Sequence, residues 1–360
     1  MLTFNIGPSK LTKATKKDIC NSIIEGVGEF SHRSREFSKI SKQAIEGLRE
    51  LFDIPKDYKI FYTNSATEAM QLCVGNCCEQ KSYHFVCGVF SEVFAKTSEL
   101  MHKKVIRNKA DFGKLNNFKT ARIQKDTDLI TITHNETSTG VMCKKSDIKL
   151  IRKKAPKAIL AVDITSSAGS FKPDIKDADV WLFSVQKCFG LPSGLGIMIV
   201  SKKAYEKSLE LLKKEKNQAG YFYFENLWSK MKEKYQTPQT PNVLNIYLLA
   251  KKLRRWNKTG GVRKNYSRAL KKYGIIEKFV FKNSKFDFFV KDKKVRSIFS
   301  VCLEAEPQII EKIHAFCTQQ KIILGQGYGD LKPYTFRIAN FPAIKESHLK
   351  KLIKIIQNQL

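Results

Sequence analysis

The chain has 360 residues, of which 42% are hydrophobic and 28% charged, values typical of a folded globular protein. These proportions exclude a disordered or fibrous chain, and the length predicts one large packed domain with a smaller one attached. Lysine and arginine number 65 against 34 acidic residues, a formal net charge of +31. The basic residues are scattered from Lys10 to Lys354 and none lies in an RNA-binding signature. We therefore interpret the charge as solvated lysine faces and expect no specific nucleic-acid partner.

The sequence also bears on where the protein acts. No segment of about twenty residues is apolar enough to cross a membrane, and the N-terminus lacks the pattern of a secretory signal. We therefore expect no membrane partner and a cytoplasmic protein. Nine cysteines, an odd number at irregular spacing, favour a reducing compartment over a disulfide framework. The histidines and cysteines do not have the spacing of metal ligands, so we predict no metal site.

Apolar runs of strand length alternate with helical stretches up to about Trp256. This alternation is the pattern of an α/β sheet with helices on both faces. The predicted strands are 59–62, 84–87, 129–134, 158–162, 180–185 and 196–200. The predicted helices between them include 67–78, 92–101 and 146–154.

Beyond Trp256 the chain predicts a smaller α+β unit. Its predicted elements are a strand at 297–305, a helix at 308–320, a strand at 335–339 and an amphipathic helix at 345–360. We therefore expect a large domain over 16–255 and a small C-terminal domain over 256–360, joined by the N-terminal segment 1–15.

Lys187 is the only charged residue between Val180 and Val200. An unpaired ammonium in apolar surroundings costs roughly several kcal/mol and tends to lose its proton. The neutral amine is a nucleophile that can form a Schiff base with an aldehyde cofactor. A lysine that extends from a strand end into solvent would give the same sequence pattern, so both interpretations stay open for Lys187 alone.

Two further features lie where parallel strands end. Asp163 follows the strand 158–162, and ligands of open α/β sheets bind at such carboxyl ends. Its carboxylate could keep a pyridinium nitrogen protonated, or it could cap a following helix. Ser65, Ala66 and Thr67 follow the strand 59–62 and open a helix, where free N–H groups and a hydroxyl could bind phosphate. Many helices begin with serine or threonine and bind nothing.

Five motifs occur in a recognisable order. They are Phe-Asn-Ile-Gly-Pro-Ser at 4–9, Ser-His-Arg-Ser-Arg-Glu-Phe at 31–37, His-Asn-Glu-Thr-Ser-Thr-Gly at 134–140, Val-Asp-Ile-Thr-Ser-Ser at 162–167 and Ser-Val-Gln-Lys-Cys-Phe-Gly at 184–190. Together they resemble class V aminotransferases of pyridoxal-phosphate fold type I, and within them the phosphoserine aminotransferase family most. The resemblance covers nearly the whole chain. It implies a large domain with a mixed, mostly parallel sheet, a smaller C-terminal α+β domain, and pyridoxal 5′-phosphate as the cofactor.

The same resemblance implies roles for four residues around the cofactor ring. Lys187 would carry the cofactor as a Schiff base and move the proton at the substrate α-carbon. Asp163 would pair with the pyridinium nitrogen, which makes the ring an electron sink. Phe90 would stack on the ring, at a position where the family usually has tryptophan, and Thr137 would hydrogen-bond the phenolic oxygen. Without the resemblance, Phe90 could equally be a core phenylalanine.

For the cofactor phosphate, the resemblance implies a cup made of Ser65, Ala66, Thr67 and Gln186. A neighbouring subunit would complete the cup with Thr237. The resemblance therefore implies a homodimer in which each active site is built from two chains.

For the amino acid and 2-oxo acid substrates, the resemblance implies three cationic groups. Arg337 alternates with two apolar neighbours on its predicted strand and would bind the α-carboxylate through two parallel hydrogen bonds. An exposed strand arginine would show the same alternation. His32 and Arg33 would bind the substrate phosphate.

Substrate choice is where the sequence departs from the family. Thr67 stands where many relatives have arginine, and the stretch 325–333 lacks an expected His-Arg pair, for which Lys332 could partly substitute. We expect transamination between phosphoserine and 2-oxoglutarate in serine biosynthesis. The alternative is an alanine- or serine-glyoxylate aminotransferase, which the reduced number of cations favours. A cysteine desulfurase or lyase, which would need a cysteine in a late loop, and a non-catalytic basic interaction protein are ranked below both.

Overall fold

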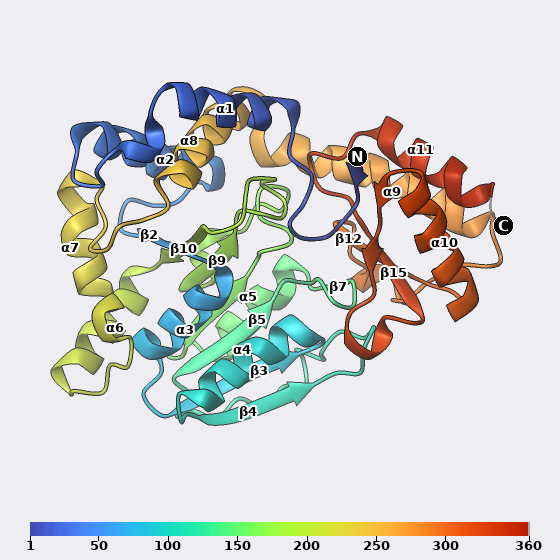
Figure 1. Cartoon of the computed structure of the whole chain (residues 1–360). Helices are drawn as coiled ribbons and strands as arrows, with labels where there is room; N and C mark the ends of the chain where they lie inside the picture. The colour runs from blue at the N-terminus through green and yellow to red at the C-terminus, as the bar shows by residue number, and fades with distance from the viewer. Residues whose placement is uncertain (359–360) are drawn as a thin grey trace.

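A seven-stranded sheet lies at the centre of the larger part of the molecule (Figure 1). In the computed structural model, which describes residues 1–358, its strands follow the order β2-β10-β9-β8-β5-β3-β4, and β10 runs in the opposite direction to the other six. The strands are β2 Lys59–Thr63, β3 Lys81–Val86, β4 Lys104–Lys109, β5 Leu129–Thr133, β8 Ile159–Asp163, β9 Val180–Ser184 and β10 Gly196–Val200. The four strands β5, β8, β9 and β10 are buried along their whole length, as their continuous apolar sequence predicts. The predicted mixed, mostly parallel sheet is confirmed.

Helices cover both faces of this sheet. Neighbouring residues of a strand point to opposite faces, so Leu182 belongs to a buried cluster that includes residues of α3, α4, α6 and α7. Phe183 belongs to the cluster on the other face, which includes residues of α2, α5 and α8. The helices of this part are α1 Lys13–Ile24, α2 Arg35–Phe52, α3 Ala66–Cys77, α4 Val89–Leu100, α5 Lys145–Lys154, α6 Lys202–Lys213, α7 Phe224–Lys234 and α8 Val243–Lys258. The sheet and its two helical layers form the α/β architecture that the alternating pattern predicts.

The smaller part contains a four-stranded antiparallel sheet of order β11-β12-β15-β14 with three helices. Its elements are α9 Gly261–Phe281, β11 Asp287–Phe288, β12 Ser300–Glu304, α10 Pro307–Gln319, β13 Ile322–Ile323, β14 Gly325–Gln326, β15 Thr335–Ala339 and α11 Glu346–Gln357. A two-stranded ribbon, β6 Asn135–Glu136 and β7 Val141–Met142, faces it from the larger part. The last two positions of the predicted helix 345–360 lie outside the described residues.

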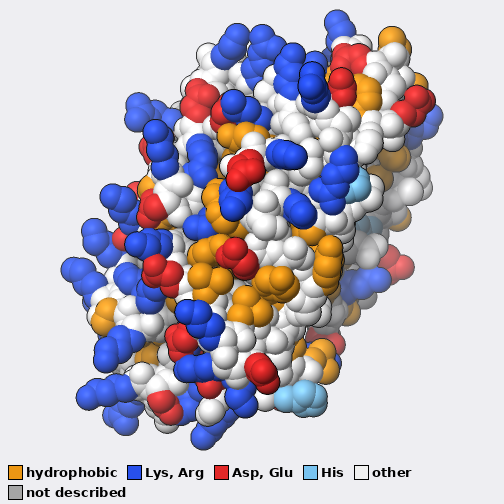
Figure 2. All heavy atoms as spheres, turned by 90° about the vertical axis from the view of Figure 1, so that its left-hand side faces the viewer, with side chains coloured by type: hydrophobic (Ala, Val, Ile, Leu, Met, Phe, Trp, Pro, Cys, Tyr) orange, Lys and Arg blue, Asp and Glu red, His pale blue; other side chains and the backbone are white. Residues whose placement is uncertain are grey.

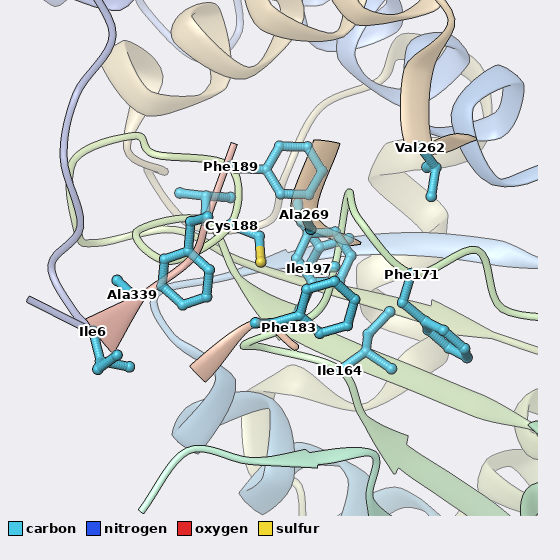
Figure 3. Packing of buried hydrophobic residues seen from close by; sticks show 14 of the residues in the cluster. Ile6, Ile164, Phe171, Phe183, Cys188, Phe189, Ile197, Val262, Ala269 and Ala339 are labelled. Atoms are coloured by element: carbon cyan, nitrogen blue, oxygen red, sulfur yellow. The ribbon is translucent and has the colours of Figure 1, made fainter. Parts of the chain in front are cut away.

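The N-terminal segment lies between the two parts. Its strand β1, Leu2–Thr3, pairs in parallel with β13, and the Ala339 N–H donates to the Phe4 carbonyl at 3.0 Å. Figure 3 shows Ile6 close to Ala339 in the buried cluster. A few residues further on, the Ser9 N–H donates to the Gln186 carbonyl at 2.8 Å. This segment therefore connects the smaller sheet to the loop that follows β9.

Charged side chains are distributed widely over the surface. On the face seen in Figure 2, lysine and arginine side chains are spread with acidic side chains between them, around a group of hydrophobic side chains in the middle of the view. All nine cysteines are free thiols. Within residues 1–358, no helix has the length and apolar character that a membrane span requires.

Candidate active site

Lys187 lies in the loop after β9, and its side chain is buried with 8% of its surface exposed. The Nζ atom donates to Thr137 Oγ1 at 2.9 Å and lies 4.5 Å from the centre of the Phe90 ring. Burial lowers the pKa of Lys187 to about 8, although the carboxylate of Asp163 acts in the opposite direction. The alternative that Lys187 extends into solvent is therefore wrong, and its neutral, reactive form is more populated near neutral pH than that of an ordinary lysine.

Asp163 is the last residue of β8, the strand beside β9. Its Oδ1 accepts hydrogen bonds from the Thr165 N–H at 2.8 Å and from Thr165 Oγ1 at 2.5 Å. Its Oδ2 has no hydrogen-bond partner among the described residues. No helix begins after Asp163, so the helix-capping alternative is wrong. Burial raises the pKa of this carboxyl, while the Thr165 hydrogen bonds and Lys187 lower it.

The buried carboxylate of Glu136 connects the ribbon that carries Thr137 to the helix that carries Phe90. Its oxygens accept from the N–H groups of Phe90 at 3.2 Å and Ser91 at 2.9 Å, at the start of α4. They also accept from Ser91 Oγ at 3.0 Å and from the Ser138 N–H and Oγ at 3.1 and 2.6 Å. Glu136 is not among the predicted site residues, although its place in the motif 134–140 could have indicated it.

Arg337 is buried on β15 and points to the same site. Its Nη1 donates to the Thr137 carbonyl at 2.9 Å and its Nε to the Gln326 carbonyl at 2.7 Å. The Tyr328 ring lies 5.5 Å from the Arg337 guanidinium and 5.5 Å from the Phe90 ring. The alternative of an exposed strand arginine is therefore wrong. Tyr328 and the Gln326 backbone belong to the stretch 325–333, which lacks the expected His-Arg pair.

The start of α3 meets the end of β9, as the phosphate-cup prediction requires. Ser65 is the N-cap, because its Oγ accepts from the Glu68 N–H at 3.1 Å. The Ala66 N–H donates to Ser184 Oγ at 2.6 Å, so it is not the free donor that we expected. The Thr67 N–H has no acceptor in the described part of the chain, and its side chain is exposed. The Ser184 hydroxyl and the Thr67 N–H are the donors left at this helix end.

Gln186 precedes Lys187 in the same loop. Its side-chain Oε1 is buried without a hydrogen-bond partner, an arrangement that is uncommon in folded proteins and indicates a missing polar neighbour. Its backbone is fixed by the N-terminal segment, since the Gln186 carbonyl accepts from the Ser9 N–H and the Lys187 carbonyl accepts from Ser9 Oγ at 2.6 Å. Ser9, like Glu136, is a residue that the predicted site lacks.

Cys188, the residue after Lys187, is buried in the hydrophobic core. It belongs to the buried cluster shown in Figure 3, its thiol donates to the Ser166 carbonyl at 3.2 Å, and burial raises the pKa of the thiol. This surrounding confirms that Cys188 is a packing residue.

His32, Arg33 and Thr237 form a second cluster within the same chain. Arg33 donates to the Thr237 carbonyl at 2.6 Å and to the Pro238 carbonyl at 3.0 Å, and His32 Nδ1 lies 3.4 Å from Thr240 Oγ1. Among residues 1–358, no hydrogen bond, ion pair or ring contact joins this cluster to Lys187. The single chain therefore does not bring these three predicted residues to the others.

Lys332 also lies apart. It lines a hollow of the smaller part with His314 and Glu311, and no interaction in the described part of the chain joins it to Arg337.

Comparison with known proteins places this geometry in context. Residues 6–341 match the family Aminotransferase class-V. A phosphoserine aminotransferase of Corynebacterium glutamicum is 29% identical over 97% of this chain and 92% of its own length. The crystal structure of a phosphoserine aminotransferase from Cytophaga hutchinsonii is similar with a TM-score of 0.95 and 33% identity, covering 100% of this chain and 99% of that one. An alanine-glyoxylate aminotransferase from Nostoc sp. shares the fold with a TM-score of 0.83 at 18% identity, over 99% of this chain and 94% of its own.

Proposed function

Because the chain belongs to the class-V aminotransferase family, we propose that it transfers the amino group between phosphoserine and 2-oxoglutarate, in the cytoplasm and in serine biosynthesis. The observation that carries this proposal is the buried Lys187 amine, held by Thr137 above the Phe90 ring and close to Asp163. The relatives that are named phosphoserine aminotransferases and align over nearly the whole chain support the substrate. The nine free thiols support a reducing compartment.

Pyridoxal 5′-phosphate is the cofactor of this family, and the residues present fit it. Lys187 would bind its aldehyde carbon, and Asp163 Oδ2, which has no other partner among the described residues, would hold its ring nitrogen. Gln186 could donate to the cofactor phosphate only through its side-chain N–H groups, together with the Ser184 hydroxyl and the Thr67 N–H. The bound cofactor supplies an electron sink that makes the substrate α-hydrogen acidic.

The protein's own residues would then orient the substrate and move protons. Lys187 Nζ, once released, would carry the proton at the α-carbon, and Thr137 Oγ1 would hold that amine in place. Arg337 uses two of its five N–H groups on backbone carbonyls, so its Nη1 and Nη2 edge still has donors for a substrate carboxylate. The buried position of these groups excludes water and strengthens each interaction.

We include a homodimer with shared sites in the proposal. The cluster of His32, Arg33 and Thr237 has cationic and hydroxyl groups suited to phosphate, yet no described interaction connects it to Lys187 in one chain. A two-fold related copy could present this cluster to the Lys187 site, with Thr237 near the cofactor phosphate and His32 and Arg33 near the substrate phosphate. Each site would then be incomplete in a single chain.

A second candidate is transamination of alanine or serine with glyoxylate. Thr67 stands where the resemblance led us to expect arginine, and the stretch 325–333 lacks the expected His-Arg pair, which leaves fewer cations for a substrate phosphate. A phosphate dianion is usually bound by more than one strong cation, so this observation favours an uncharged side chain on the substrate.

The deciding experiment compares kcat/KM for two substrate pairs on the cofactor-loaded protein. We expect phosphoserine with 2-oxoglutarate to exceed alanine with glyoxylate by about a hundredfold or more, because a site that binds a phosphate leaves its donors unpaired with alanine. The variant Arg33→Ala should reduce turnover of phosphoserine much more than that of alanine. A preference for alanine would replace the proposal by the second candidate, and a protein that binds no cofactor and turns over neither pair would contradict both.

A further inference from the structure

A cavity of about 780 Å³ lies apart from the Lys187 site, between the start of α1, the middle of α9 and the start of α11. In Figure 1 these three helices lie along the upper edge of the molecule. The volume is in the range of cavities that bind small molecules. Its lining includes one carboxylate, Glu346, and six cationic side chains, which are Lys10, Lys13, Lys16, Arg268, Lys272 and Lys345.

Most of these cations have no acidic partner. Lys272 is held by the wall itself, because its Nζ donates to the carbonyls of Phe341 at 2.8 Å and Ile344 at 3.0 Å. None of the other five forms an ion pair with a described residue. Burial, together with the neighbouring charges of Lys16 and Lys345, lowers the pKa of Lys10. Lys10 is therefore repelled by Lys16 and Lys345, which are exposed at the rim like Lys13 and Arg268, and a bound anion would relieve that repulsion.

The overall excess of lysine does not account for this arrangement. A cavity between β5 and α6 is lined by four lysines and four carboxylates, so its charges balance. In the cavity beside His134, two of the lining lysines are paired, Lys145 with Asp174 and Lys172 with Asp53. Cations that form no ion pair with a described residue line that cavity too, namely Lys144 and Arg263, but the cavity at α1, α9 and α11 differs in having six cations against a single carboxylate.

The backbone of the same wall adds donors. Both α1 and α11 begin at the cavity, and the N–H groups of Ala14 and Ser347 have no acceptor in the described part of the chain. Such helix starts are favourable positions for phosphate oxygens, and here they add to a wall that is already cationic.

We propose that this cavity binds a small polyanion that carries two or more phosphate groups, such as a nucleoside diphosphate or triphosphate or a short inorganic polyphosphate. Arg268 can bind one phosphate group in the bidentate manner, while Lys16 and Lys345 neutralise another. The proposal does not depend on the transaminase reaction, because none of the cavity's cations touches the Lys187 site.

Calorimetric titration of the cofactor-loaded protein with inorganic tripolyphosphate tests this proposal. The cavity variant combines Lys16→Gln, Arg268→Gln and Lys345→Gln. The matched control combines Lys17→Gln, Lys271→Gln and Lys350→Gln, which removes the same charge from the same three helices outside the cavity. We expect one saturable site in the wild type and the control, and a Kd about tenfold higher or more in the cavity variant, since charge-assisted contacts to phosphate are lost.

A second measurement keeps the test decisive if the cavity variant fails to fold. Acetylation of lysines in the wild type, read by peptide mass spectrometry, should be slowed by tripolyphosphate at Lys13, Lys16 and Lys345 and unchanged at Lys17 and Lys350.

Titration with ADP in parallel distinguishes a nucleotide from inorganic polyphosphate as the source of the phosphate groups.

Four results would overturn the proposal. They are an equal loss of affinity in the control and cavity variants, an absence of saturable binding, binding of citrate as tight as that of tripolyphosphate, and a short RNA that binds more tightly but is weakened equally by both sets of substitutions. The last result would assign the charge to a nucleic-acid surface instead.

Discussion

The chemistry of the candidate site depends on one amine. Lys187 is buried, has a single hydrogen bond to Thr137, and has a pKa lowered to about 8 chiefly by desolvation. With such a pKa, about one tenth of the amine is neutral at pH 7, whereas an ordinary lysine has only about 0.04%. The buried position thus supplies a nucleophile at the pH of the cell without a separate base.

This amine leads to a prediction about pH. A lowered pKa means that the neutral, reactive form appears at lower pH than for a free lysine. We therefore expect the rate at which cofactor-free protein takes up pyridoxal phosphate, followed by absorbance, to rise with pH and level off above a midpoint near 8. N-acetyl-lysine serves as the control and should keep rising towards about pH 10.4. A protein rate that follows the free amino acid would contradict the lowered pKa.

At the scale of elements, the helix α4 and the ribbon β6-β7 act as one unit through Glu136. The N-cap of α4 is Gly88, which has no side chain to cap the helix, and the carboxylate of Glu136 takes that role from 48 residues away in the sequence. A Cβ at position 88 would lie 2.4 Å from the Glu136 side chain, so only glycine allows this close approach.

We predict that Glu136→Ala lowers the free energy of unfolding by about 2–4 kcal/mol, because several buried N–H and hydroxyl groups lose their acceptor. Phe90 and Thr137 would also lose their relative position, so kcat should fall. The control Glu92→Gln changes a partly exposed carboxylate of the same helix and should cost about 1 kcal/mol or less. Denaturant unfolding of both variants gives the two free energies. An equal loss of unfolding free energy in both variants would show that Glu136 stabilises the fold no more than a partly exposed carboxylate does.

The sequence predicted the bounds of those strands whose own residues form an apolar or alternating run. It missed features that depend on residues far away in the chain. The strands 196–200 and 335–339 have their predicted bounds, because each is a continuous apolar or alternating run. The start of α4 lies three residues before its predicted position, since its cap comes from Glu136. The edge strand β4 was not predicted, because its half-exposed residues Lys104–Lys109 are mostly polar and its order depends on pairing with β3.

The candidate site also combines residues that the sequence indicates with contacts between distant segments that it does not. The structure links Lys187, Thr137, Phe90 and Arg337 through a chain of contacts. Lys187 and Thr137 lie in two of the five motifs, whereas Phe90 and Arg337 lie outside all five and were assigned through the resemblance. Contacts that join distant segments, such as Ser184 with Ala66, could not be derived from spacing. The roles of the site residues remain predictions until the variants are measured.

At the scale of the whole molecule, the main question is whether two chains share a site. If they do, a mixture of Lys187→Ala and Arg33→Ala chains should form hybrid dimers with one intact site. Each variant alone should be inactive towards phosphoserine, and refolding them together in equal amounts should restore up to about a quarter of the wild-type activity, from random pairing. No recovery in confirmed hybrid dimers would place Arg33 and Lys187 in the same chain's site.

The division of the chain into 16–255 and 256–360 remains our proposal for its domains. The helix α8 ends at Lys258 and α9 begins at Gly261, so the proposed boundary falls near the junction of two helices. The N-terminal segment belongs to neither unit alone, since it pairs with β13 and also contacts the loop of Lys187.

Because the N-terminal segment pairs with a strand near the other end of the chain, this pairing can form only late in synthesis. Leu2 leaves the ribosome first, yet its strand partner, Ile322, is synthesised only when most of the chain has already emerged. At about 5–20 residues per second, the first residues wait many seconds for that partner. The larger sheet can assemble meanwhile, but the pairing of β1 with β13 and the contact of Arg337 with Thr137 need the last part of the chain, so nascent chains that stop before residue 322 should lack a finished catalytic centre.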